Sequence, residues 1–444
     1  MKGEPRSTGR SFRIITLGCR VNQYESAYFH QALSRSGWRP AERGERADAV
    51  IVNTCIVTRR AAHQSRQAIR KAIRENPEGR VAAAGCYAQV FPETLSAIPG
   101  IGLIVDNRSK AMLPRLLWDA AAEKGPVTAC REFEPDTPFE LLPVERFPGR
   151  SRANLKIQDG CGSFCAYCIV PFARGPCRSL PPSEVLSMMA ALAGAGHREV
   201  VLTGIHLGKY GVDLGGDVRL DGLLRAVGRE GLPVRVRLSS LHPDEIDDAL
   251  IERVAGEPWL CPHFHISLQS GDDTVLKRMN RTYTARQFSR LVNRIHDRIP
   301  LAAIGVDIIS GFPGESPAAH RQTVSLIRDL PVSYLHVFPF SARPGTAAAA
   351  FDGRVDAETI RKRAGKLRDL GQRKRAGFYA RCLGQTFPVL VEGWCGRGRK
   401  VMRGTSDNYL PVRFASMEGA VNRVVPVTVE RAGKAHVWGG PPGD

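Results

Sequence analysis

Three cysteines within eight residues, Cys161, Cys165 and Cys168, constrain this chain more than any other feature. Their C-x₃-C-x₂-C spacing puts three thiolates on one short loop, which can hold a soft metal or an iron–sulfur cluster. A four-iron cluster with three thiolate ligands leaves one iron open to another molecule. A zinc site would need a further ligand, for which Cys177 is the nearest candidate in sequence. A zinc site or buried structural cysteines are therefore the alternatives to a cluster.

The residues around this loop place it at the end of a strand. The run 153–158 predicts a buried strand, and Asp159-Gly160 predicts the turn after it. In α/β proteins, functional residues gather where strands end in this way. The spacing, with Tyr167 before the last cysteine, resembles the radical S-adenosylmethionine (SAM) enzymes. That resemblance implies a [4Fe–4S] cluster whose open iron binds SAM and whose electron cleaves SAM to a 5′-deoxyadenosyl radical.

Length, charge and cysteine content bound the remaining possibilities. A chain of 444 residues is long enough for roughly three domains. A net charge of +19 favours a polyanionic partner such as nucleic acid, although a generally basic proteome would also explain it. Eleven cysteines cannot all pair, the N-terminus lacks the apolar core of a signal peptide, and no apolar run approaches a membrane span. We therefore expect a cytoplasmic protein that does not enter the membrane.

A βαβαβ pattern runs through the N-terminal region, residues 11–125. Strands are predicted at 12–17, 47–53 and 80–84, and helices between them. Cys19, Cys55 and Cys86 follow these three strands. Because parallel strands have their carboxyl ends on one edge, the three cysteines should converge there. Three converging thiols predict a second three-cysteine cluster, whereas each cysteine alone would suggest an ordinary buried thiol.

A three-cysteine α/β region ahead of this core resembles the methylthiotransferase family of radical SAM enzymes. The matching segments are Thr16–Ser26, Asn53–Thr58 and Gly85–Gln89. The resemblance covers nearly the whole chain and implies a transferase with two [4Fe–4S] clusters. By this resemblance, the core cluster generates the radical, the N-terminal cluster supplies or carries sulfur, and a second SAM methylates that sulfur. Both clusters should then face one cavity.

The middle of the chain predicts an open barrel. After a Pro-, Glu- and Phe-containing linker at 126–150, the core at 151–380 alternates helices with strands. Helices are predicted at 183–194, 220–228, 244–255, 285–298 and 318–330, and strands at 199–202, 234–238, 263–268, 303–309 and 334–338. With the strand before the cysteine loop, this makes an open (β/α)₆ barrel, the shape that radical-SAM cores resemble.

Small and polar residues follow several of these strands. Glycines allow a ligand close to the backbone, and hydroxyls and amides supply polar contacts. By resemblance, the candidate SAM-contacting residues are Tyr167, Thr203, Gly204, Ser239, Ser267 and Gln269. His263 and His265 could suggest a metal, but their alternation along one strand favours core or rim positions.

The C-terminal part predicts RNA contact. Residues 354–381 form a basic helical pattern that we expect to contact phosphate, although a solvated helix face is the alternative. Short alternating strands at 387–392, 399–403, 410–414 and 424–430 predict a small β-barrel at 381–442. It resembles the TRAM RNA-binding domain. Trp394, Tyr409 and Arg413 are candidate RNA-contacting residues, with core packing an equal alternative for the tryptophan.

The resemblance also suggests a substrate. The cysteine motifs look like those of the enzymes acting on N6-threonylcarbamoyladenosine at position 37 in the tRNA anticodon loop. The alternatives are isopentenyladenosine in tRNA and an aspartate of a ribosomal protein. A different class, a non-catalytic RNA-binding protein that uses metal only to fold, would bind no SAM. The chemistry implies an electron donor such as flavodoxin or ferredoxin.

Overall fold

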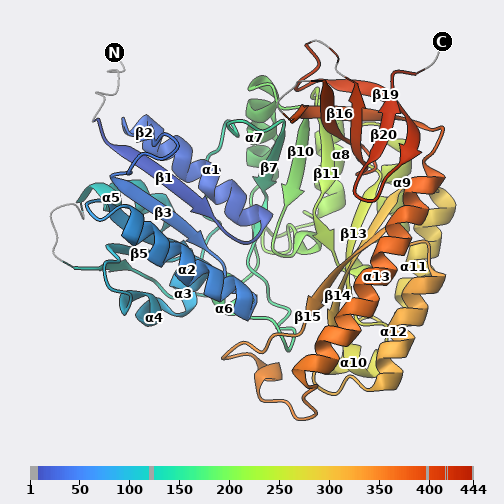
Figure 1. Ribbon diagram of the computed structural model, residues 1–444, viewed down its shortest axis with the longest axis horizontal. Coiled ribbons are helices and arrows are strands. Elements are labelled where there is room, and N and C mark those ends of the chain that lie inside the picture. Colours follow the sequence, from blue (N-terminus) through green and yellow to red (C-terminus); the bar gives the residue numbers. More distant parts are fainter. Residues whose placement is uncertain (1–8, 120–124, 397–399, 416, 418, 443–444) are drawn as a thin grey trace.

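The computed structural model describes residues 9–119, 125–396, 400–415, 417 and 419–442. Figure 1 shows an N-terminal sheet with its helices beside a curved central layer of strands, and a small barrel above that layer. Among the described residues, no helix is both long and apolar enough to cross a membrane.

The N-terminal region is a six-stranded parallel sheet in the order β2-β1-β3-β4-β5-β6. Its strands are β1 Ser11–Thr16, β2 Arg39–Pro40, β3 Ala49–Thr54, β4 Arg80–Gly85, β5 Leu103–Val105 and β6 Val127–Ala129. Every residue of β3 is buried, as expected for a central parallel strand covered on both faces. The predicted βαβαβ unit is confirmed, with α1 Arg20–Arg35 and α2 Arg59–Glu75 as its long helices.

The short strand β6 lies inside the segment that we predicted as linker. It pairs with β5 through Leu103–Val127 and Val105–Ala129, so the sheet extends past residue 125. Three residues are too few to show an alternating pattern, which is why the sequence did not reveal this edge strand. The remaining short helices of this region are α3 Cys86–Val90, α4 Pro92–Ser96, η1 Lys110–Met112 and α5 Leu113–Asp119.

The core has the predicted open (β/α)₆ arrangement. Its parallel strands are β7 Arg152–Lys156, β10 Glu199–Thr203, β11 Arg235–Leu238, β12 Ser240–Leu241, β13 His263–Gln269, β14 Ala303–Ser310 and β15 Tyr334–Pro339. They form a sheet β11-β10-β7 and a sheet β12-β13-β14-β15, with Ser239 between β11 and β12. The outer helices are α7 Pro182–Gly194, α8 Leu220–Glu230, α9 Asp248–Gly256, α10 Asp273–Arg278, α11 Ala285–Arg298 and α12 Pro317–Asp329.

One predicted helix of the core, 244–255, is wrong in its first turn. The chain forms a 3₁₀ helix, η4, at Pro243–Glu245, and Ile246 is extended. The α-helix begins only at Asp248, where the Asp247 side chain caps it by accepting from the Leu250 amide at 2.8 Å. Pro243 and the capping aspartate divide what the apolar periodicity suggested was one helix.

The C-terminal part is a long helix, α13 Ala357–Arg381, followed by a closed barrel β16-β17-β18-β20-β19. The strands are β16 Thr386–Cys395, β17 Val401–Ser406, β18 Pro411–Ala415, β19 Val424–Ala432 and β20 Val437–Gly440. The predicted small β-barrel is confirmed, although β20 was missed and Arg399, the first residue of one predicted strand, lies outside the described residues.

Buried arginines attach this barrel to the core. Arg235 Nη1 donates to the Pro388 carbonyl at 2.7 Å, and Arg237 Nη2 donates to the Ser406 carbonyl at 3.0 Å. Both guanidinium groups also pair with Glu199, at 2.7 and 2.8 Å. Because all three side chains are buried, these contacts fix the barrel firmly against the core.

Candidate active site

The loop with Cys161, Cys165 and Cys168 lies between β8, Gln158–Asp159, and α6, Val170–Arg174. The Cys168 amide donates to the Cys165 carbonyl at 2.8 Å, and Asn280 Nδ2 donates to the Phe164 carbonyl at 3.2 Å. Burial first, and then charge on Cys165 and Cys161, raise the pKa of Cys168 to about 12. The loop therefore brings its three thiols close together.

His206, in the loop after β10, contacts the first of these cysteines. Its Nδ1 lies 3.3 Å from Cys161 Sγ, and its Nε2 lies 2.5 Å from Glu245 Oε1. Burial lowers the pKa of His206, but hydrogen bonds with Cys161 and Glu245 outweigh burial and raise it to about 9. Burial also raises the pKa of Cys161, but the His206 contact outweighs it and leaves that pKa below its ordinary value. The histidine therefore favours the thiolate form that iron requires.

Tyr167 belongs to this loop, between Cys165 and Cys168, and is partly buried. Arg281 Nη2 donates to its hydroxyl at 2.6 Å, and its ring packs edge-on against Phe312 with centroids 6.4 Å apart. Arg281 also contacts His242 at 2.9 Å. The predicted aromatic residue is thus held by Arg281 and Phe312, next to the cysteines of the loop.

The residues predicted to contact SAM lie in or directly after the carboxyl-terminal parts of β10, β11 and β13. They are Thr203, Gly204, Ser239, Ser267 and Gln269. The Ser239 hydroxyl is buried, with no hydrogen-bond partner among the described residues. Gln269 has a left-handed backbone, with φ of +70°, which costs energy for a residue other than glycine. At Gly204 a Cβ would lie 2.9 Å from Gln158 Oε1, so only glycine leaves this rim open. The unpaired hydroxyl of Ser239 would be satisfied by a polar ligand bound at these strand ends.

The N-terminal cysteines lie where the sequence placed them, after β1, β3 and β4. Asn22 Nδ2 ties two of these strand ends together by donating to the Leu17 and Thr54 carbonyls at 2.7 and 3.0 Å. Burial first, and then charges on Cys86 and Cys19, raise the pKa of Cys55 to about 12. The three thiols are therefore neighbours, as the parallel sheet predicted.

Gly18 permits this close approach. It has φ of +94°, and a Cβ there would lie 2.9 Å from Cys55 Sγ. A larger residue would push apart the loops that carry Cys19 and Cys55. In water-excluded surroundings, a thiol such as Cys55 ionises at neutral pH only when a metal or a cation compensates its charge. The N-terminal set thus has the chemistry of a buried metal or cluster site.

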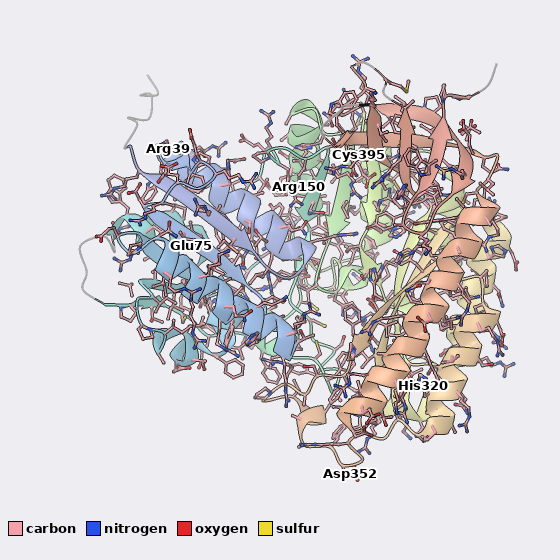
Figure 2. All side chains as sticks on the ribbon, viewed as in Figure 1. Arg39, Glu75, Arg150, His320, Asp352 and Cys395 are labelled. Atoms are coloured by element: carbon pink, nitrogen blue, oxygen red, sulfur yellow. The ribbon has the colours of Figure 1, made fainter. Side chains whose placement is uncertain are left out.

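A basic cavity of about 300 Å³ lies beside the N-terminal set. Its wall includes Arg20, Arg150, Arg152, Arg403 and Tyr409, which come from the N-terminal region, the core and the C-terminal barrel. Arg150 is labelled in Figure 2, where these three parts meet. Arg20 directly follows Cys19 in the chain, and its Nη2 donates to the Tyr409 hydroxyl at 3.3 Å. The cavity therefore begins one residue after Cys19 and offers arginines suited to bind phosphate.

A second cavity of about 310 Å³ shares Arg152 and Tyr409 with the first. Tyr334 and His336 of β15 line it together with Arg375. The same region of the barrel interior holds polar groups in mutual contact. His265 Nε2 lies 2.8 Å from Asp307 Oδ1, and His263 Nε2 lies 2.7 Å from the Tyr334 hydroxyl.

These contacts agree with the predicted core or rim positions of His263 and His265. His263 is buried, and His265 lies partly open toward the barrel interior. Geometry alone would also allow a metal to be held by His265, Asp307 and His336, or by His206, His242 and Glu245. In the second group, His206 already contacts a predicted cluster ligand, which makes it part of the cysteine site.

The candidate RNA-contacting residues of the barrel are all partly buried and differ in what they contact. Trp394 is partly buried and packs against the apolar core of the barrel, so the packing alternative holds for it. The Arg413 guanidinium lies 6.0 Å from the Trp438 ring, while Tyr409 faces both cavities. Of these three, Tyr409 is placed best to stack on a base.

Comparisons with known proteins agree on both halves of the site. The profile of "Uncharacterized protein family UPF0004" matches residues 11–106, and that of the radical SAM superfamily matches residues 155–327. Threonylcarbamoyladenosine tRNA methylthiotransferase MtaB of Bacillus subtilis is 36% identical over 422 residues, covering 94% of this chain and 93% of that protein. The tRNA-2-methylthio-N(6)-dimethylallyladenosine synthase of Pelotomaculum thermopropionicum is 32% identical and covers 97% of each chain.

A solved structure supports the fold. The radical SAM methyltransferase TsrM of Kitasatospora setae, with cobalamin and a [4Fe–4S] cluster bound, superposes with a TM-score of 0.58. The match covers 76% of this chain and 77% of that chain at 17% identity, so it speaks for the fold alone.

Proposed function

Because the chain belongs to the methylthiotransferase family of radical SAM enzymes, we propose that it converts N6-threonylcarbamoyladenosine at position 37 of tRNA to its 2-methylthio derivative. Enzymes of this family are transferases that use SAM and [4Fe–4S] clusters. The choice of substrate rests on the 36% identity with a threonylcarbamoyladenosine tRNA methylthiotransferase over nearly the whole chain.

The two cysteine sets fit the two clusters. Cys161, Cys165 and Cys168 would hold the core cluster, and Cys19, Cys55 and Cys86 the N-terminal one. When bound, these groups supply the electron that cleaves SAM and the sulfur that is transferred. The chain holds the ligand loops and orients SAM on the rim through residues such as Ser239. We also propose that a flavodoxin or ferredoxin delivers the electron.

The proposed substrate differs from the isopentenyl alternative in its threonylcarbamoyl substituent. That substituent carries a carboxylate, a hydroxyl and a urea, whereas a dimethylallyl group is purely hydrocarbon. A wall built to hydrogen-bond a substrate rejects an apolar analogue, because its polar groups would be left without partners.

A direct assay compares two anticodon stem-loops that differ only in the substituent. We expect the reconstituted protein, with SAM and a reductant, to methylthiolate the threonylcarbamoyl stem-loop at least about a hundredfold faster than the isopentenyl one. Nucleoside mass spectrometry measures both products, and a stem-loop with unmodified adenosine is the control. Faster reaction of the isopentenyl stem-loop would overturn the proposed substrate while leaving the reaction class intact.

A variant of Arg403 tests whether tRNA binds along the first cavity. It is exposed and lines the first cavity beside Tyr409. We expect Arg403→Glu to weaken tRNA binding by about tenfold. The slope of the logarithm of the binding constant against the logarithm of salt concentration should become less steep by about one, the value for one lost phosphate contact. The matched control is Arg229→Glu, which reverses an exposed arginine at the end of α8 that lines neither cavity. Equal losses in both variants, measured by fluorescence anisotropy, would mean that only net charge matters.

A further inference from the structure

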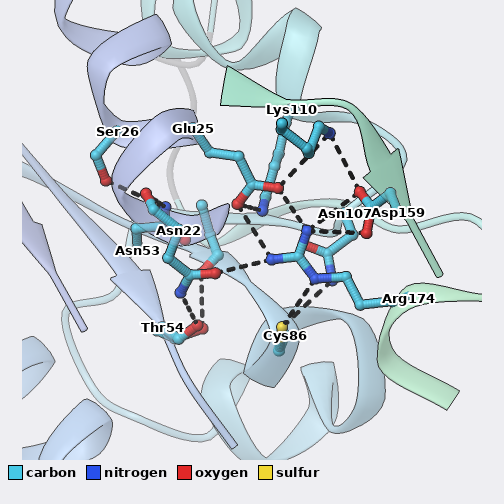
Figure 3. Close-up of polar contacts among 12 residues, drawn as sticks. Asn22, Glu25, Ser26, Asn53, Thr54, Cys86, Asn107, Lys110, Asp159 and Arg174 are labelled. Atoms are coloured by element: carbon cyan, nitrogen blue, oxygen red, sulfur yellow. Dashed lines mark hydrogen bonds and ion pairs between the residues drawn. The ribbon is translucent and has the colours of Figure 1, made fainter. Parts of the chain in front are cut away.

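A buried set of charges lies between the two cysteine sites. Its members, which we call the Arg174 network, are Glu25, Lys110, Lys156, Asp159, Arg174 and Arg178. Each is less than a tenth exposed, and Arg174 and Lys110 are fully buried. Figure 3 shows Arg174 at its centre, between Glu25, Asp159 and Cys86.

Arg174 joins the N-terminal region to the core. It is the last residue of α6, and Nη1 donates to Glu25 Oε1 of α1 at 2.6 Å. Nη2 donates to Asn22 Oδ1 at 2.8 Å, and Nε points to Cys86 Sγ at 3.4 Å. On the core side, Nη1 lies 3.2 Å from Asp159 Oδ2. One guanidinium therefore contacts the loops of both cysteine sets.

The two residues of the network that flank the core cysteine loop lie close to it in sequence. Asp159 stands two residues before Cys161, and Arg174 stands six residues after Cys168. Both ends of the core cysteine loop thus belong to the network that also contacts Cys86. A shift of the N-terminal sheet relative to the core would break these buried charged contacts, which is strongly unfavourable.

The network carries more positive than negative charge. Four of its side chains are cationic, and only Glu25 and Asp159 are carboxylates. Glu140 lies at the margin, where burial raises its pKa. Burial also lowers the pKa of Lys110, and with both Glu140 and Lys110 neutral, three cations still face two carboxylates. Buried charge without a counterion is unfavourable, so the arrangement fits an additional anion next to Arg174.

A cluster on the N-terminal cysteines is such an anion. The oxidised four-iron core carries two positive charges and three thiolates carry three negative ones, which makes the assembly a monoanion that gains a further negative charge on reduction. Hydrogen bonds to ligand sulfurs and nearby positive charge stabilise the reduced form. Arg174 supplies both at Cys86.

We propose that Arg174 is a positioning residue that locks the N-terminal region to the core and, through its Nε–H bond to Cys86, raises the reduction potential of the N-terminal cluster. This inference rests on the proposed function, because that function places a cluster on Cys19, Cys55 and Cys86. It adds a residue whose role is to set the relative placement of the two sites and the electronic state of one of them.

The experiment measures the potential of the N-terminal cluster alone. Full-length protein with Cys161, Cys165 and Cys168 replaced by alanine carries this one cluster, and a redox titration followed by electron paramagnetic resonance gives its midpoint. We expect Arg174→Gln to shift the midpoint to a more negative value, and Arg174→Lys to shift it less, because lysine keeps the charge but not the directed Nε–H. If the glutamine variant does not fold, the lysine variant still tests the inference.

The matched control is Arg235→Gln. Arg235 is also a buried arginine paired with a glutamate, Glu199, but its hydrogen bonds go to that glutamate and to carbonyls of the C-terminal barrel. Its midpoint should equal that of the parent. An unchanged midpoint in both Arg174 variants, or an equal shift in the Arg235 variant, would overturn the inference. Absence of iron from the parent would instead contradict the two-cluster function.

Discussion

Replacing Cys161, Cys165 and Cys168 together with alanine is expected to halve the iron, from about eight to about four atoms per chain, and to abolish cleavage of SAM. The three thiols share one loop, and Asn280 Nδ2 holds that loop in place by donating to the Phe164 carbonyl. Without these ligands the core has no site for the cluster that reduces SAM. Iron analysis after anaerobic reconstitution and chromatographic detection of 5′-deoxyadenosine measure the two effects.

The control for this variant is Cys261→Ala. Cys261 is also a free thiol, but it is buried two residues before β13, near Arg237 and away from both cysteine sets. It should keep its iron and its 5′-deoxyadenosine production. Unchanged iron in the triple variant would contradict the assignment of the core cluster and would favour a metal that serves only for folding.

Replacing Cys19, Cys55 and Cys86 with alanine should separate the two halves of the reaction. We expect this variant also to lose about half of its iron, but to keep the core cluster and therefore to keep producing 5′-deoxyadenosine. Formation of the methylthio product should fall by at least about a thousandfold, because the group that supplies sulfur is gone. The two readouts must be measured on the same sample.

The core triple variant is the natural comparison for this result. The core variant should lose both 5′-deoxyadenosine and product, while the N-terminal variant should lose product alone. Methylthio product at near wild-type rates in the N-terminal variant would contradict the division of labour between the sites. Complete loss of SAM cleavage there would mean that the two sites act as one.

The cysteine geometry was predictable because it depends on chain periodicity. Parallel strands that end in Cys19, Cys55 and Cys86 must place those residues on one edge, and the structure confirms it. The barrel strands from 199 to 339 were found for the same reason, since buried β-branched runs alternate with helical patterns. The helix predicted at 244–255 failed where a proline and a capping aspartate interrupt the pattern.

The contacts between domains were not predictable in this way. Arg20 meets Tyr409 across 389 positions of sequence, and Arg174 meets Asn22 across 152. Neither arginine belongs to a periodic pattern, and each acts through a side chain that reaches another region. The excess of arginine and lysine did indicate an anionic partner, but it could not show that part of this charge is buried beside Cys86.

The most direct test of the account is the nucleoside profile of tRNA from cells lacking this gene, with and without the gene restored. We predict that 2-methylthio-N6-threonylcarbamoyladenosine disappears, that its unmethylthiolated precursor accumulates, and that the restored gene reverses both changes. Restoration with the Cys19, Cys55 and Cys86 triple variant should fail. An unchanged level of this nucleoside in the deleted strain, with loss of the methylthio-isopentenyl nucleoside instead, would contradict the proposed substrate.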